Sequence, residues 1–398
     1  MNRYDGWILK GGQSGNQIEY LDDEPSAEKF FSQYVVPRRP VVIKSVSNDL
    51  SSLSTWTNEY LIQHAGESEV EVEKRTSVKS NFGQGDVVKM KFKDVVQKLD
   101  NGDESLYLTT QTIRCNRNGQ PNIISEPLTH LTSDFPIRPK LFGNLLPMNL
   151  NLWMGNAKNG SSTGLHHDYH DNLYVLLRGS KQFRLYSPAD TSKMYTQGQV
   201  VKVHPNGRIN YIGFETQADG SETGSLESLQ LELRKLKAEK ELQAAELAVA
   251  NKELGSAVKL SNAEKEMEAV MDLLISDEVD DYYDDSAESD DNEPMKKKLK
   301  CNDPTIVPLN FSRVSNFENP GKEFPEFSRA VGEIVTLHAG EMLYLPAGWF
   351  HEVTSKNSDG SHGHMAFNYW MHPGDSSEFN TPYKSEFWKL ENQLRETQ

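Results

Sequence analysis

The chain has 398 residues, and 36% of them are hydrophobic, which is enough for a core in one large domain or two. The net charge of −16 argues against a nucleic-acid surface, and no run approaches the roughly 18 apolar residues of a membrane helix, so neither partner is expected. Residues 1–12 lack the apolar core of a signal peptide, and Cys115 and Cys301 give no disulfide framework. Both observations favour a protein kept inside the cell.

Residues 1–135 predict alternating helices and strands. The expected helices are residues 26–35, 56–64 and 87–99, and the expected strands are residues 41–43, 69–74 and 105–111. Arg38 and Arg39 are interpreted as a solvated turn. Tyr107 and Thr109 share one face of the last strand. Their hydroxyls would contact a ligand if that strand lines a pocket, and Tyr107 would otherwise be a core residue.

Residues 149–155 predict a further strand, which leads into the stretch Ser161–Pro188. His166 and Asp168 are separated by one residue, and successive side chains of a strand alternate between faces. The imidazole and the carboxylate therefore point the same way. Residues 173–177 and 181–186 predict the two strands of a β-hairpin, with a tight turn at residues 178–180.

Lys181 lies on the returning strand and shares a face with Phe183 and Leu185. An ammonium group with apolar neighbours lies either at the edge of the core or buried in the core opposite an anion. A buried, unpaired charge costs roughly several kcal/mol, so a buried Lys181 needs a partner. No acidic residue lies in the predicted hairpin, which makes a bound anionic ligand the expected partner.

The composition changes in residues 213–302. Leucines and alanines at three- and four-residue spacing over residues 226–257 predict one long charged helix of coiled-coil type. It could associate with a partner, including a second copy of the chain, or be a solitary solvated helix. Residues 276–294 contain ten acidic residues and no Lys or Arg, which predicts disorder. Subtracting these ten charges leaves −6 for the remainder of the chain.

The basic cluster Pro294–Lys300 follows the acidic tract. Such clusters are typical of nuclear localisation signals, although this one could simply neutralise the acidic residues beside it. The expected location is therefore the nucleus, the cytoplasm or both.

The last part of the chain predicts more strands, at residues 306–309, 334–337, 342–345 and 365–370, and a helix at residues 378–393. A turn at residues 346–349 presents His351 at the start of another strand. Because of this placement, His351 is the preferred partner of His166 and Asp168. The competing histidines are His167, His170, His204, His338, His362, His364 and His372.

Two histidines and one carboxylate on one face of a metal form the facial triad of non-haem Fe(II) oxygenases, which leaves positions open for other reactants. The set His166, Asp168 and His351 therefore predicts Fe(II) as the metal, with 2-oxoglutarate and O2 as co-substrates. Lys181 would pair with the distal carboxylate of 2-oxoglutarate.

The other expected contacts of 2-oxoglutarate come from two pairs of polar residues. Thr163 and Tyr107 are predicted to bond the same distal end as Lys181. Asn172 and Asn368 are predicted to orient the end near the metal, because amides both donate and accept hydrogen bonds.

Two blocks of sequence resemble one known family. They are HHD followed by DNLYVLLRGSKQFRLYSP, within residues 166–188, and AGEMLYLPAGWFHEV, residues 339–353, followed by FNYW. Both resemble the JmjC family of 2-oxoglutarate oxygenases, and within it the small JmjC-only hydroxylases of the jumonji-domain-containing-protein-seven type. The residues named above as iron and 2-oxoglutarate ligands fall on the family's positions.

The resemblance covers residues 26–212 and 303–373 and implies a mainly β fold with surrounding helices. Its core would be a double-stranded β-helix of the cupin or jelly-roll type, interrupted by the helical and disordered insert. The implied divisions are a lead-in at 1–135, barrel halves at 136–212 and 303–373, the insert at 213–302 and a C-terminal helix at 374–398.

The implied function is a dioxygenase that hydroxylates a side chain of a protein substrate, with lysyl favoured. A JmjC histone lysine demethylase is the alternative within the same chemistry. A reading of another class is a non-catalytic cupin scaffold that acts through the coiled coil.

Overall fold

The structure is a computed structural model that describes residues 3–12, 16–75, 86–115, 121–283, 307–357 and 363–396. The chain divides into two compact units. The first contains residues 1–220, 302–384 and 392–398, and the second contains residues 221–301 and 385–391. Each helix in the described part of the chain is too short or too polar to cross a membrane.

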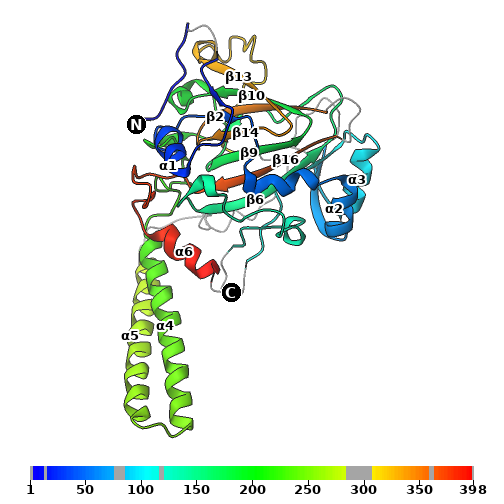
Figure 1. Cartoon of the computed structure of the whole chain (residues 1–398). Helices are drawn as coiled ribbons and strands as arrows, with labels where there is room; N and C mark the ends of the chain where they lie inside the picture. Colours follow the sequence, from blue (N-terminus) through cyan, green and yellow to red (C-terminus); the bar gives the residue numbers. More distant parts are fainter. Residues whose placement is uncertain are drawn as a thin grey trace. The chain divides into compact units, whose positions relative to one another are not determined.

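The first unit is built on two sheets (Figure 1). The larger sheet has the strand order β1 (Glu19–Leu21), β2 (Val41–Ile43), β14 (Met342–Leu345), β9 (Asp171–Arg178), β16 (His364–Met371), β6 (Pro147–Gly155), β5 (Leu106–Leu108), β3 (Glu69–Lys74) and β4 (Asp86–Lys91). The smaller sheet has the order β13 (Gly332–His338), β10 (Ser180–Tyr186), β15 (Phe350–Lys356) and β7 (Ser161–Ser162), and β8 (His166–His167) also pairs with β15. A separate ribbon joins β11 (Val200–Val203) and β12 (Ile209–Tyr211).

The two sheets face each other across an apolar core. Strands β9, β14 and β16 of the larger sheet and β10, β13 and β15 of the smaller one contribute alternate residues to it, among them Leu176, Leu343, Phe183, Leu337 and Val353. The strands β14, β9, β16 and β6 thus form one wall of a barrel, and β13, β10, β15 and β7 form the other. This arrangement is the predicted double-stranded β-helix.

The predicted β-hairpin at the centre of the sequence is wrong. Strands β9 and β10 do follow each other at the expected place, but β9 pairs with β14 and β16, whereas β10 pairs with β13 and β15. The link between them crosses from one sheet to the other at Gly179, whose φ of +83° favours glycine. A Cβ at Gly179 would also lie 2.5 Å from the carbonyl oxygen of Lys356. The tight turn was therefore read correctly, but its two strands are not partners.

Helices cover the outer face of the larger sheet. They are α1 (Ala27–Phe30), the π-helix η1 (Phe31–Val35), α2 (Asn58–Ala65) and α3 (Phe92–Asp100), with short 3₁₀ segments at Asn48–Thr55, Leu128–His130 and Lys140–Phe142. Two further 3₁₀ segments are Pro188–Lys193 and Phe327–Arg329, and Phe327 packs in a separate cluster with Tyr186 of the smaller sheet. Ser26 caps α1 as predicted, since its hydroxyl accepts a hydrogen bond from the Lys29 amide. Phe30, Leu61 and Val95 pack from three of these helices into one core with the sheet.

Several other predicted boundaries need correction. Residues 87–91, predicted as the start of a helix, belong to edge strand β4, which pairs with β3, and only residues 92–100 are helical. The strand expected at 105–111 ends at Leu108. Residues 307–309 form no strand, and Ile306 lies outside the described residues. The last helix, α6 (Phe387–Glu396), begins nine residues later than expected.

The second unit contains an antiparallel helical hairpin of α4 (Ser225–Ala250) and α5 (Ser256–Tyr283) (Figure 1). The prediction of one long helix is therefore wrong. The chain turns where Lys252 and Gly255 adopt positive φ angles of 56° and 77°. The apolar stripe finds its partner within the chain, because Leu229 on α4 and Val270 on α5 are both buried.

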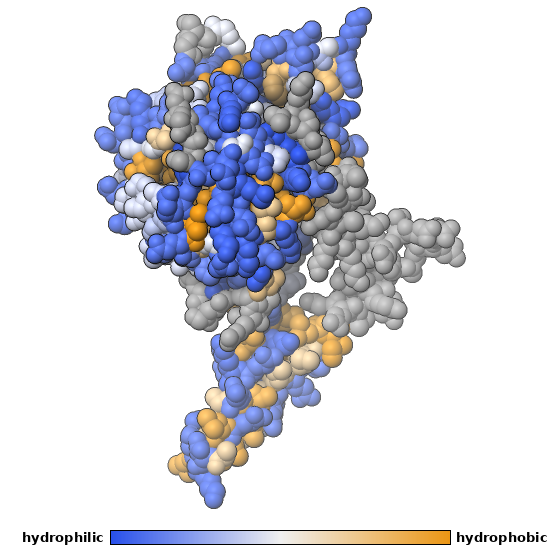
Figure 2. Space-filling view, turned by 90° about the vertical axis from the view of Figure 1, so that its right-hand side faces the viewer, coloured by the Kyte–Doolittle hydropathy of each residue, from blue (hydrophilic) through white to orange (hydrophobic). Residues whose placement is uncertain are grey.

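Part of the predicted seam nevertheless lies on the surface. Leu247 and Leu254 are exposed, and apolar residues are visible along the hairpin in Figure 2. Residues 276–283 continue α5, so the first part of the tract predicted to be disordered is helical. The rest of that tract, Pro294–Lys300 and Cys301 lie outside the described residues.

Candidate functional site

The structure brings His166, Asp168 and His351 together. Strands β8 and β15 are antiparallel, and their register places His166 directly opposite His351, with ring centroids 4.4 Å apart. One ligand atom from each of the three residues lies within 4.8 Å of the other two. The turn before β15 holds this geometry, since the Gly348 amide donates a 2.9 Å hydrogen bond to the Asp168 carbonyl.

Both histidines are oriented by backbone carbonyls. The Nδ1 atom of His166 lies 3.0 Å from the Gly164 carbonyl oxygen, and that of His351 lies 2.9 Å from the Trp349 carbonyl oxygen. A carbonyl can only accept a hydrogen bond, so each Nδ1 carries the proton and each Nε2 presents its lone pair. This is the tautomer that a metal-binding imidazole needs.

Charge at the three residues also suits a cation. Burial, reinforced by the neighbouring His351, lowers the pKa of His166 to about 4, so its imidazole is neutral at pH 7. Burial alone would raise the pKa of Asp168, but the surrounding histidines outweigh it and the pKa is lowered, which keeps the carboxylate ionised. Two imidazoles and one carboxylate are the donor set of a divalent metal site.

A chain of amides leads from Asp168 into the barrel. The Asn172 amide donates a weak, 3.4 Å hydrogen bond to the Asp168 carboxylate, and Asn368 donates a 2.9 Å bond to the Asn172 carbonyl. The indole of Trp153 donates a 2.8 Å bond to Asn368. Both predicted asparagines therefore lie at the metal end. Trp153 was missed, although its alternation with Asn149 and Asn151 on β6 was visible in the sequence.

A buried ion pair holds the segments that carry the triad. Arg38 bonds Asp171 with both terminal nitrogens, and the side chains are 3% and 0% exposed. Asp171 also accepts hydrogen bonds from the Tyr344 hydroxyl (3.0 Å) and the Ala347 amide (2.9 Å). The solvated-turn interpretation is thus wrong for Arg38. No local pattern indicated that Asp171, 133 residues away, was its partner.

Lys181 lies inside the barrel, 1% exposed, and burial lowers its pKa to about 7. Its Nζ donates a 2.5 Å hydrogen bond to the Ser355 hydroxyl and lies 5.6 Å from the centre of the Tyr107 ring. Within the described residues no carboxylate pairs with it. The predicted Lys181 and Tyr107 are therefore neighbours, and Ser355, missed from sequence, is a third member.

The hydroxyl of Thr163 is bonded to the backbone. Its hydroxyl donates to the Gly164 carbonyl and accepts from the Val353 amide, at 3.1 and 3.2 Å. The second bond joins the segment after β7 to β15, and among the described residues Thr163 makes no hydrogen bond with Lys181.

The interior residues fit the predicted metal and 2-oxo acid. Asn151 lies opposite Asn368 on β6, is 2% exposed, and neither its amide nitrogen nor its oxygen has a hydrogen-bond partner in the described structure. Unpaired buried polar atoms are costly, and a polar ligand would satisfy them. Together with the buried ammonium of Lys181, they make the space between triad and lysine suitable for a carboxylate-bearing molecule.

The competing histidines lie elsewhere or have other contacts. His167 faces away from His166 and lies 2.7 Å from the Tyr211 hydroxyl. His170 stacks on Trp370, His204 lies 3.1 Å from the Thr216 carbonyl oxygen, and His338 is exposed. His364 and His372 are buried outside the triad, and His362 lies outside the described residues.

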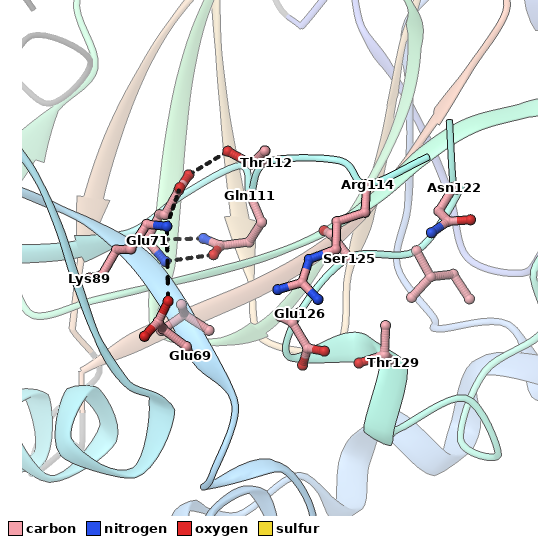
Figure 3. A pocket seen from close by; sticks show the side chains of 12 residues that line it. Glu69, Glu71, Lys89, Gln111, Thr112, Arg114, Asn122, Ser125, Glu126 and Thr129 are labelled. Carbon is pink, nitrogen blue, oxygen red and sulfur yellow. Dashed lines mark hydrogen bonds and ion pairs between the residues drawn. The ribbon is translucent and has the colours of Figure 1, made fainter. Parts of the chain in front are cut away.

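A separate polar groove of about 280 Å³ lies between β3, β4 and residues 111–129 (Figure 3). The Gln111 amide bonds both backbone groups of Glu71 at 2.7 Å, and Thr112 donates to the Glu71 carboxylate. None of the predicted site residues lines this groove. The groove is therefore separate from the cluster of His166, Asp168 and His351.

Comparison with known proteins agrees with this site. A family model described as a cupin-like domain matches residues 27–377, so the chain has a cupin-like fold. JmjC domain-containing protein 4 of Schizosaccharomyces pombe is 32% identical, and the match covers 99% of this chain and 93% of that protein. The chain therefore belongs to the JmjC family of cupin-like proteins.

Two further relatives are more distant. The Arabidopsis thaliana protein named lysine-specific demethylase JMJ32 is 24% identical over 89% of this chain and 82% of its own length. The human protein named bifunctional peptidase and (3S)-lysyl hydroxylase JMJD7 is 26% identical over 44% of this chain and 55% of its own length. The resemblance noted to the jumonji-domain-containing-protein-seven type thus covers less than half of the chain.

Proposed function

We propose that this chain is an Fe(II)- and 2-oxoglutarate-dependent dioxygenase that hydroxylates a lysyl side chain of a protein substrate. One observation carries the proposal: two imidazoles, each with its Nδ1 bonded to a backbone carbonyl, converge with a carboxylate in a barrel that also encloses Lys181. Iron held by such a triad, with 2-oxoglutarate and O2, supplies the oxidation of a C–H bond.

The chain's own residues would have three tasks. His166, Asp168 and His351 would hold the metal, and Asn172 with Asn368 would fix the carboxylate of Asp168. Lys181 and Tyr107, deep in the barrel, would bind the distal carboxylate, with Thr163 as a further contact. The closed apolar core behind them would exclude water from the reacting groups.

The choice of a lysyl residue rests on the similarity to the human lysyl hydroxylase. The Arabidopsis demethylase, which matches more of the chain, favours N-demethylation of lysine as the second candidate. Both reactions begin with oxidation of a C–H bond on a lysine side chain, and they differ in whether the product releases formaldehyde.

The test is peptide mass spectrometry of a cell extract incubated with the purified chain, Fe(II), ascorbate and 2-oxoglutarate. A gain of one oxygen on a defined lysine supports the hydroxylase. Loss of methyl groups with release of formaldehyde supports the demethylase instead. If no peptide changes and no succinate forms, the non-catalytic cupin scaffold becomes the favoured hypothesis. His166→Ala is the inactive control, and His338→Ala, at an exposed histidine outside the site, is the matched active one.

Location and assembly remain proposals. Nuclear location rests on Pro294–Lys300, and deleting this cluster from a fluorescent fusion should shift the protein to the cytoplasm.

A homodimer would form through the exposed apolar residues of the α4–α5 hairpin. Sedimentation of the full chain at several concentrations tests this, and a constant monomer mass would remove the idea.

A further inference from the structure

His364 lies inside the barrel at the end remote from the metal. It is on the same face of β16 as Asn368, four residues away, so the two are separated by roughly 13 Å along the strand. Its ring is 5.9 Å from the ring of Tyr107, and the charge of Lys181 acts on it. His364 is thus beside the predicted carboxylate-binding residues and not beside the triad.

The imidazole of His364 has no hydrogen-bond partner. The residue is 2% exposed, and in the described part of the chain neither ring nitrogen is bonded. A buried polar group left in this state costs free energy, and such cases in native structures usually reflect a ligand or a function. Structural packing alone would be served better by an apolar side chain.

The barrel wall makes room for this ring. A Cβ at Gly155, on β6, would lie 2.8 Å from ring atoms of His364 and 2.8 Å from Tyr107. The absence of a side chain at Gly155 therefore lets the two rings lie on either side of it. Burial, with a smaller contribution from Lys181, lowers the pKa of His364, so the ring is neutral and offers one N–H donor and one acceptor.

Lys181 completes the arrangement. Its bond to Ser355 leaves two of its three N–H groups for other acceptors, and a neutral imidazole donor stands nearby. A carboxylate, with two oxygens, matches one ammonium and one imidazole N–H.

We propose that His364 is a ligand-binding residue that donates a hydrogen bond to the distal carboxylate of the 2-oxo acid and makes the pocket selective for dicarboxylic 2-oxo acids. The proposal rests on the proposed function, since it concerns the binding site of the same 2-oxo acid. It adds a specificity-determining residue that the sequence suggested only as a competing metal ligand.

The test compares two ligands on the full-length chain loaded with Mn(II), by calorimetry: 2-oxoglutarate, and 2-oxobutyrate, which lacks the distal carboxylate. His364→Leu should weaken 2-oxoglutarate binding about tenfold, the value of one charge-assisted hydrogen bond, and leave 2-oxobutyrate binding unchanged. His364→Gln, which keeps an N–H donor, should recover part of the loss. The melting temperature of ligand-free His364→Leu should not fall, because no bond is removed.

Each other outcome counts against the inference. Equal weakening of both ligands, or a lowered melting temperature, would assign His364 a structural role. Unchanged affinities would show that it does not touch the ligand, while the proposed function would stand. If the wild-type chain binds Mn(II) but neither 2-oxo acid, the proposed function fails and this inference fails with it. His338→Leu, at an exposed position, controls for the loss of a histidine.

Discussion

Asp171→Asn should destabilise the protein strongly. The Asp171 side chain is fully buried and bonds the guanidinium of Arg38, the hydroxyl of Tyr344 and the amide of Ala347. Burial opposes the charge on Arg38, but the neighbouring carboxylate outweighs it and raises the pKa of Arg38, so the cation is present at all ordinary pH values. The substitution keeps the shape of the side chain, but it removes the charge and turns one acceptor oxygen into an NH2 donor, which leaves the Arg38 cation uncompensated.

Removing one partner of a buried pair costs about 3–5 kcal/mol, roughly a fifth or more of the ~5–15 kcal/mol that stabilises a typical domain. Urea unfolding of the metal-free protein measures this. The double variant Arg38→Met/Asp171→Leu should lose less than Asp171→Asn, because no isolated charge remains. Asp22→Asn is the control, because Asp22 pairs with Lys44 at the surface, and it should leave the urea concentration at half unfolding unchanged. A loss below about 1 kcal/mol in Asp171→Asn would refute this account of the pair.

Three further predictions concern the lysine, the amide chain and the hairpin. The pKa of Lys181 is about 7 in the folded state and near 10.5 in the unfolded state, so the unfolded state binds more protons between these pH values. The free energy of unfolding of the ligand-free protein should therefore rise with pH across this window, by up to about 1.4 kcal/mol per pH unit. Lys181→Met should abolish this rise in urea unfolding measured over a series of pH values. Trp153→Phe leaves the side-chain carbonyl of Asn368 without its hydrogen-bond donor and should weaken Mn(II) binding about tenfold in a calorimetric titration. An unchanged Mn(II) affinity would show that the bonded amides of Asn172 and Asn368 do not support the metal site. Leu229→Asp puts a carboxylate into the buried stripe of α4 and should reduce the helical circular dichroism signal, whereas Leu254→Asp, at an exposed position, should not; equal spectra would mean that the stripe does not hold the hairpin.

Local periodicity predicted much of the barrel because its strands are short and strongly patterned. Strands β2 and β3 have the predicted limits, and β14 agrees as well. The same patterns could not say which strands pair. In this fold the link at Gly179 crosses between sheets, so a turn that looks like a hairpin joins strands with different partners. Pairing depends on contacts between residues distant in sequence, which alternation within one strand does not encode.

The residues of the site were likewise predictable only where a local sequence pattern marked them. His166 and Asp168 were visible because one residue separates them, and His351 because a turn precedes it. Arg38 and Asp171 were not, because an ion pair between distant residues leaves no local pattern. The helical hairpin was missed for a related reason: heptad-like spacing continues through the turn at residues 251–255, although Leu254 there is fully exposed. For Lys181 the apolar company on its strand left a rim or a buried position open, and the structure shows the buried one.

The central claim is that His166, Asp168 and His351 bind iron that supports turnover of 2-oxoglutarate. The most direct test measures succinate formed from 2-oxoglutarate by the purified chain with and without Fe(II), beside His351→Ala and His338→Ala. We predict succinate only with Fe(II), none from His351→Ala, and wild-type amounts from His338→Ala. Succinate at equal rates in wild type and His351→Ala, or none from a wild-type chain supplied with its protein substrate, would contradict the claim.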